Sequence, residues 1–239
     1  MYRLTSLLAA GAIALASATV AAGTTQDAKD ASDEARRISE SLDVLRELTT
    51  TPEDRIPAYL LERAEAIIVI PSLVKGGFVI GAKHGKGVIA VRDRANGTWS
   101  APGFVSMTGG SIGWQIGLES VDLVLLVMNK GGVDELLEDR FTLGGTASVA
   151  AGPVGRQADA ATNAQLSSQI LAYSRAKGLF AGATLEGAAL NADDDANADF
   201  YGVEEIGLRD VLSRGMPATP QMAATWRATL DRITGGAGR

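Results

Sequence analysis

The chain has 239 residues, with 22 basic and 28 acidic side chains, a formal net charge of −6 and 46% hydrophobic residues. This length and apolar content allow a domain with a substantial core, whereas the acidic balance argues against general nucleic-acid binding, which requires a basic face. The chain contains no cysteine, which excludes disulfides, zinc–thiolate sites, thiol nucleophiles and a lipid-attachment cysteine.

Residues 1–22 predict a signal peptide. Arg3 precedes an alanine-rich apolar run from Leu7 to Val20, and small residues follow at 21–22, as they do at signal-peptide cleavage sites. No later apolar run reaches the length that a bilayer-spanning helix needs. We therefore expect an exported, periplasmic protein that is peripheral to a membrane.

Helical periodicity follows this segment. Apolar residues recur at three- and four-residue spacing from Ala31 to Leu45, which predicts an amphipathic helix. The segment 49–52 should end it, and a second short helix is expected at 56–65. The apolar run Ile67 to Pro71 predicts a buried strand that ends at the proline.

From residue 72 to residue 152 the pattern changes to short β-branched and aromatic runs separated by glycines, which predicts strands with bulges and tight bends. Asn96-Gly97 is the clearest hairpin signal. Further along the chain we expect a helix, two strands and two closing helices, at 133–138, 169–174, 178–190, 206–212 and 220–233. The predicted fold class is α+β: a mostly antiparallel, strongly bent glycine-rich sheet or sandwich packed by N- and C-terminal helices.

Two glycine-rich motifs resemble catalytic or nucleotide-binding signatures, and neither is complete. Gly109 to Gly113 matches the G-x-S-x-G nucleophile elbow around Ser111, but a strand is expected after it instead of a helix, and the only histidine, His84, lies upstream. The segment around Gly85-Lys86 lacks the spacing of a Walker A loop. We therefore expect no enzyme, no catalytic residue and no cofactor.

A basic strip lies between Pro71 and Arg92, where four cations occur without an intervening acid: Lys75, Lys83, Lys86 and Arg92. Glycine N–H groups and ammonium charges together can bind a phosphate headgroup. The alternative is that these lysines are ordinary solvated turn residues.

An acidic segment near the C-terminus copies most of a calcium-binding loop. Its oxygen-bearing side chains have the spacing of EF-hand ligands, and they are Asp193, Asp195, Asn197, Asp199 and Glu204. The position at which an EF-hand needs glycine is Ala198, and the flanking segments do not predict the required helices. A surface loop whose Asp and Asn side chains cap local turns is the alternative to a metal site.

Several motifs, in one order, resemble the SYLF domain family. They are Lys75-Gly-Gly-Phe-Val-Ile-Gly81, Gly85-x-Gly87, Trp99-Ser-Ala-Pro102, Gly113-x-Gln115-x-Gly117, Tyr173-Ser-Arg-Ala-Lys-Gly-Leu-Phe-Ala-Gly182, Leu185-Glu-Gly187 and Phe200-Tyr-Gly202. The chain then divides into a signal peptide (1–22), an extension with the start of the amphipathic helix (23–37), a SYLF-like domain (38–202) and a C-terminal helical extension (203–239).

The resemblance implies a non-catalytic lipid-binding module, since eukaryotic members bind phosphoinositides and actin filaments. Carried over by charge and motif position, it points to the basic strip and adds Arg175 and Lys177. For an exported member we expect an anionic phospholipid or a similar envelope anion as the ligand. The alternative function is an envelope structural or protein-interaction scaffold with an envelope protein as its partner, stabilised in one version by calcium at 193–204.

Overall fold

The computed structural model describes residues 33–48, 55–93, 95–137, 141–145, 147–154, 167–176, 179–182, 185, 187–213 and 220–235. For the strand segments 77–80, 111–118 and 179–182 it describes the backbone only. The predicted signal peptide and Lys177 lie outside the described residues.

Helices and strands mix along the chain. A helix over 33–48 comes first. It is followed by α2 (Ala58–Arg63), β1 (Ala66–Val91), β2 (Gly103–Val127), α3 (Lys130–Leu136), β3 (Phe141–Thr142), β4 (Val149–Ala151), β5 (Ile170–Ala176), β6 (Leu179–Gly182), β7 (Ala188–Ala192), α5 (Asp194–Tyr201), α6 (Leu208–Leu212) and α7 (Gln221–Ile233). None of the helices in the described part of the chain combines the length and the apolar character that crossing a bilayer requires.

Strands β1 to β7 form one sheet, in the order β3-β7-β2-β5-β4, with β1 paired to β2 and β6 paired to β5. Among these pairs only that of β4 with β5 is parallel. β2 is the central strand: β1 follows one of its edges, while the other edge pairs with β7 through 105–109 and with β5 through 122–127. The predicted α+β class with a mostly antiparallel, bent sheet is confirmed.

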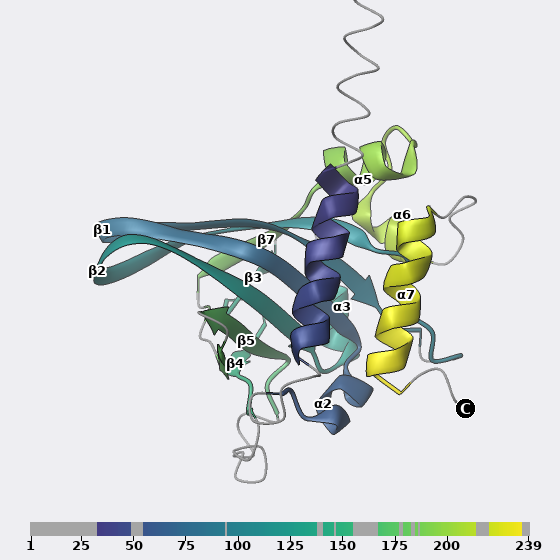
Figure 1. Cartoon of the computed structure of the whole chain (residues 1–239), viewed down its shortest axis with the longest axis horizontal. Coiled ribbons are helices and arrows are strands. Elements are labelled where there is room, and N and C mark those ends of the chain that lie inside the picture. Colours follow the sequence, from purple (N-terminus) through teal and green to yellow (C-terminus); the bar gives the residue numbers. More distant parts are fainter. Residues whose placement is uncertain are drawn as a thin grey trace, which may run out of the picture.

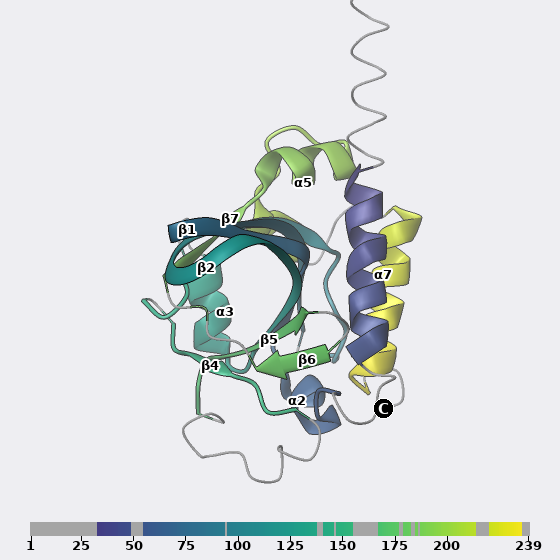
Figure 2. The ribbon, with the colours of Figure 1, turned by 60° about the vertical axis from the view of Figure 1, so that its left-hand side comes forward.

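β1 and β2 form one long two-stranded hairpin, which we call the ribbon. Its register runs from Ala66 opposite Val127 to Ile89 opposite Gly103. Asn96-Gly97 lies in the connecting turn, where Gly97 has a φ of +73°, so the hairpin predicted at this dipeptide is confirmed. The ribbon reaches away from the helices and curls back (Figure 1), and Figure 2 looks into the curl.

The prediction that a strand ends at Pro71 is wrong. β1 continues past it through a bulge, because the register shifts between Ile70 and Leu73. Ser72 takes a φ of +53° there, and its N–H donates to Oδ1 of Asp122 at 3.0 Å. The bulge leaves Pro71 outside the regular ladder, so its missing N–H breaks no strand-to-strand hydrogen bond.

Two glycines allow the two halves of β1 to touch. A Cβ atom at Gly85 would lie 2.7 Å from Cγ2 of Ile70, and one at Gly87 would lie 2.3 Å from the carbonyl oxygen of Val69. A side chain at either position would push the halves apart. The Gly85-x-Gly87 motif is therefore part of a packed, folded strand and does not form a phosphate-binding turn.

The sheet buries both of its faces, because alternate residues of the strands enter different clusters. Ile67, Val69 and Phe104 pack with the helix over 33–48, α2 and α7 on the outer face. Ile68 and Val105 instead pack inside the curl with α3 and α6. Both ribbon views place the helix over 33–48 (purple) beside α7 (yellow) (Figures 1 and 2). Continuous apolar strands are typical of a sheet covered on both sides.

Replacing Gly87 by alanine would test the close approach. We expect the free energy of unfolding to fall by about 1–3 kcal/mol, the usual cost of overpacking, because the new methyl group would meet the Val69 backbone and the Ile70 side chain. Urea denaturation followed by circular dichroism measures this change. Gly110→Ala is the matched control, because a Cβ atom there meets nothing within 4 Å. Equal losses in the two variants would contradict the packing role of Gly87.

Candidate functional site

The basic strip predicted from the sequence divides into two sets, of which the first is Lys75 and Lys83. They lie on the two limbs of β1, one before and one after the point where the strand folds back. In the described part of the chain neither forms an ion pair or a side-chain hydrogen bond. Burial lowers the pKa of Lys83, and the nearby Lys75 charge lowers it further, as a like charge does. We call these two residues the ribbon pair.

The second set is held by groups of the protein itself. Nζ of Lys86 lies 3.0 Å from Oδ2 of Asp193. Nε of Arg175 donates to Oδ2 of Asp122 at 2.8 Å, and Arg175 also pairs with Glu47. To reach a headgroup, either cation would first have to leave these partners.

Arg92 belongs to the same set. Its Nη1 donates to the carbonyl oxygen of Glu62 at 2.9 Å, and its guanidinium lies 4.7 Å from the centre of the Trp99 ring. The side chain therefore ties α2 to the turn of the ribbon. Lys86, Arg92 and Arg175 have structural roles that sequence reasoning missed. Their partners Asp193, Glu62 and Asp122 are distant along the chain.

The nucleophile-elbow motif is not on a strand-to-helix turn. Ser111 lies within β2, opposite Gly81 of β1, whereas an elbow needs a sharp turn into a helix. His84 is exposed and lies opposite Thr108 in the ribbon. The motif is therefore a strand segment of the ribbon.

The calcium-loop interpretation of the acidic segment is wrong in its local structure. Asp194–Tyr201 forms helix α5, so Asp195, Asn197 and Asp199 cannot wrap around one point as loop ligands do. Asn197 is fully buried, and its amide is bound to the Phe104 backbone. Within the described residues no group of three or more His, Asp or Glu side chains is arranged to hold a metal ion.

A cleft of about 500 Å³, which we call the α5 cleft, lies where the helix over 33–48, β1 and α5 meet. Its volume is in the range of small-ligand sites. Its lining mixes carboxylates and cations and comprises Asp33, Glu34, Arg36, Arg37, Glu40, Pro71, Ser72, Lys86, Asp193, Asp195, Ala196 and Asp199.

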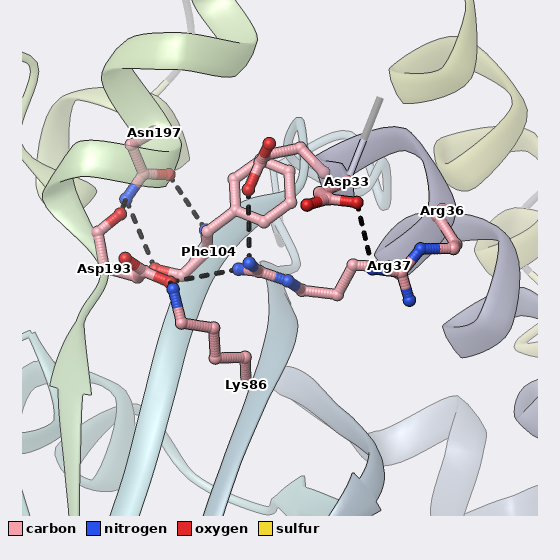
Figure 3. A network of polar contacts seen from close by, with 8 residues as sticks. Asp33, Arg36, Arg37, Lys86, Phe104, Asp193 and Asn197 are labelled. Atoms are coloured by element: carbon pink, nitrogen blue, oxygen red, sulfur yellow. Dashed lines mark hydrogen bonds and ion pairs between the residues drawn. The ribbon is translucent and has the colours of Figure 1, made fainter. Parts of the chain in front are cut away.

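Arg37 is the centre of an ion-pair network in this cleft. Its Nη1 donates to Oδ2 of Asp193 and its Nη2 to Oε1 of Glu34, both at 3.1 Å. The guanidinium lies 5.2 Å from the centre of the Phe104 ring. Figure 3 shows Arg37 reaching toward Asp193, which Lys86 also contacts. The network joins the helix over 33–48, which we call the N-terminal helix, to the ribbon and to the start of α5.

Asn197 fixes α5 against β2. Its Oδ1 accepts a hydrogen bond from the Phe104 N–H at 2.8 Å, and its Nδ2 donates to the carbonyl oxygens of Phe104 at 3.2 Å and Asp193 at 3.0 Å. These bonds hold Asp193 at the start of the helix (Figure 3). Sequence reasoning assigned Asn197 to a metal site, because residue identity alone does not separate a ligand from a buried structural amide.

Glu34 is a buried acid that sequence reasoning missed. The residue is 4% exposed, and its Oε2 has no hydrogen-bond partner among the described residues. Burial raises the pKa of Glu34, and this effect outweighs the lowering by its own backbone and by Arg37; Asp193 and Asp199 raise the pKa further. The only available signal was the three-residue spacing of Glu34 and Arg37 on one helix face.

Glu34→Gln should remove one contribution to the pH dependence of the free energy of unfolding. The folded-state pKa of Glu34 is raised above its ordinary value of 4.5, so between these two values the folded protein binds more protons than the unfolded chain. Stability therefore falls as the pH rises through this window. Urea unfolding at a series of pH values should show that the free energy of unfolding of the variant rises relative to that of the parent as the pH increases.

The matched control is Glu40→Gln, which changes an exposed carboxylate of the same helix. If Glu34→Gln and the parent gave parallel pH profiles of the free energy of unfolding, the proposed proton uptake at Glu34 would be wrong.

Comparison with known proteins places this fold in a family. The Ysc84 family model, described as "Las17-binding protein actin regulator", matches residues 108–233. Protein YSC84 of Saccharomyces cerevisiae is 42% identical over 150 residues, which cover 62% of this chain and 32% of that protein. LAS seventeen-binding protein 3 of the same species is 41% identical over 180 residues, or 74% of this chain and 39% of that protein.

Animal relatives are similar as well. SH3 domain-containing YSC84-like protein 1 of Homo sapiens is 32% identical over 204 residues, which cover 84% of this chain and 58% of that protein. The chain thus spans between about a third and three fifths of the length of these relatives. The chain belongs to the Ysc84 family, that of the SYLF domain, whose members are non-catalytic binding proteins.

Proposed function

We propose that this chain is a membrane-binding module that contacts anionic phospholipid through the ribbon pair. The observation that carries the proposal is the pairing of Lys75 and Lys83, two cations of β1 that lie close enough for one to lower the pKa of the other. The ribbon to which they belong extends beyond the helices (Figure 1). Each lysine near a negatively charged leaflet contributes about 1 kcal/mol of attraction.

The charge pattern within the basic strip supports this assignment. Lys86 is neutralised by Asp193 and Arg175 by Asp122, whereas the ribbon pair has no such partner among the described residues.

A protein-interaction scaffold is the second candidate. It is favoured by the description of the family, which names Las17 binding and actin regulation, and by the name of the yeast relative LAS seventeen-binding protein 3. In this alternative the ribbon pair would contact an acidic partner protein instead of a lipid surface.

Flotation of the purified protein with vesicles tests the lipid proposal. We expect binding to vesicles that contain phosphatidylglycerol, weakening as salt screens the lysines, and no binding to phosphatidylcholine alone. Lys75→Gln with Lys83→Gln should lower the partition coefficient about 30-fold, the product of two losses of about 1 kcal/mol.

Lys86→Gln is the matched control, because it removes a neighbouring lysine whose charge is already paired with Asp193. It should change partitioning far less than the double variant, and circular dichroism should show all variants folded. Flotation that is absent, or that falls equally in the control, would overturn the proposed site. An acidic protein captured by the parent and lost in the double variant would then favour the scaffold.

We also propose that the protein is exported by the signal peptide predicted at 1–22. Full-length expression in a Gram-negative host should give a periplasmic product whose mass corresponds to a start at Gly23. Leu15→Arg places a charge in the apolar run and should leave an unprocessed cytoplasmic chain. Mass spectrometry of the two fractions measures both outcomes, and an uncleaved parent would contradict export by this route.

A further inference from the structure

We propose that the α5 cleft is a second binding site, which takes an organic cation, an ammonium or guanidinium group, against Glu34. This site is separate from the ribbon pair and does not depend on lipid binding.

The first argument is the charge balance of the cleft. Its lining holds six carboxylates against three cations. Arg36 is engaged by Asp33 and Glu40, while Arg37 and Lys86 share Asp193. The lining therefore carries more carboxylates than cations, which favours a positively charged occupant.

The second, independent argument is the buried oxygen of Glu34. The Glu34 side chain is 5% exposed and uses only Oε1 for Arg37, while Oε2 is buried without a hydrogen-bond partner in the described part of the chain. An unsatisfied buried acceptor is costly. Glu34 lines the cleft, so an N–H donor that reached Oε2 there would supply the missing hydrogen bond and stabilise the ionised carboxylate.

The arrangement suits a polyatomic cation better than a metal ion. Among the described residues no three carboxylates or imidazoles are placed to surround a metal. An ammonium has three N–H donors and a guanidinium five, so one such group can reach oxygens that are too dispersed to share a metal. Pro71 and Ala196 give the cleft an apolar wall, against which an aliphatic stem can pack.

This chemistry has two natural sources: a free polyamine, or a lysine or arginine side chain of a partner peptide. Isothermal titration of the protein with putrescine, agmatine and N-acetyl-lysine methylamide compares them, with 1,4-butanediol as the uncharged analogue of putrescine. Binding of putrescine or agmatine would indicate a free amine. Binding of the lysine derivative alone would indicate a peptide side chain.

Glu34→Gln should weaken binding of the cation about 10- to 100-fold, the effect of losing one hydrogen bond to a charged group. Asp195→Asn, at an exposed position of the same lining, tests the cleft without disturbing a buried group and should weaken binding less. Lys86→Gln removes a competing cation from Asp193 and should strengthen binding. The Lys75/Lys83 double variant should bind like the parent.

Several results would overturn the proposal. They are equal affinity in the parent, Glu34→Gln and Asp195→Asn; binding of 1,4-butanediol as strong as that of putrescine; displacement of putrescine by equimolar Ca²⁺; and no heat of binding for any of the three cations. A negative result for cation binding would not affect the interpretation of the vesicle flotation, because the ribbon pair contributes nothing to the lining of the α5 cleft.

Discussion

The contact between the two halves of β1 is the constraint on which the rest of the structure depends. Gly85 and Gly87 have no side chains, so the backbone around Val69 and Ile70 can lie directly against them. This contact turns a long hairpin into a curl with an inside and an outside. The inside is filled by its own side chains, by α3 and by α6, and the outside is left for the N-terminal helix and α7. It also brings Lys75 and Lys83 together from opposite limbs of one strand.

The cations of the ribbon differ in whether another part of the chain pairs with them. Where the start of α5 approaches β1, Asp193 pairs with Lys86. Lys75 and Lys83, by contrast, have no ion pair among the described residues. A buried network such as Glu34–Arg37–Asp193 adds little net stability, because desolvation offsets much of the Coulomb attraction. Its value lies in fixing one position of the N-terminal helix relative to α5.

Much of the fold could be predicted from local signals. Asn96-Gly97 predicted the hairpin correctly, since this signal acts over a few residues. The helix expected at 133–138 instead begins at Lys130, after the cap at Asn129. The bulge at Ser72 could not be predicted, because it depends on Asp122 from another strand. The candidate site was harder to predict from the sequence for the same reason. Asp193 and Lys86 looked like members of a calcium loop and a lipid strip, and only the tertiary contact between them shows that they are partners.

The central position of β2 has a consequence for the nascent chain. Its first neighbour, β1, leaves the ribosome before it, but Val105 to Gly109 must wait for β7 and Asp122 to Val127 must wait for β5. Until those later segments emerge, a strand as apolar as Leu123 to Val127 presents an unpaired edge, the kind of surface that pairs readily with other chains. Pairings between segments so far apart also close slowly. The interval between the synthesis of β2 and that of β7 is therefore when the unpaired edge of β2 is most open to pairing with other chains.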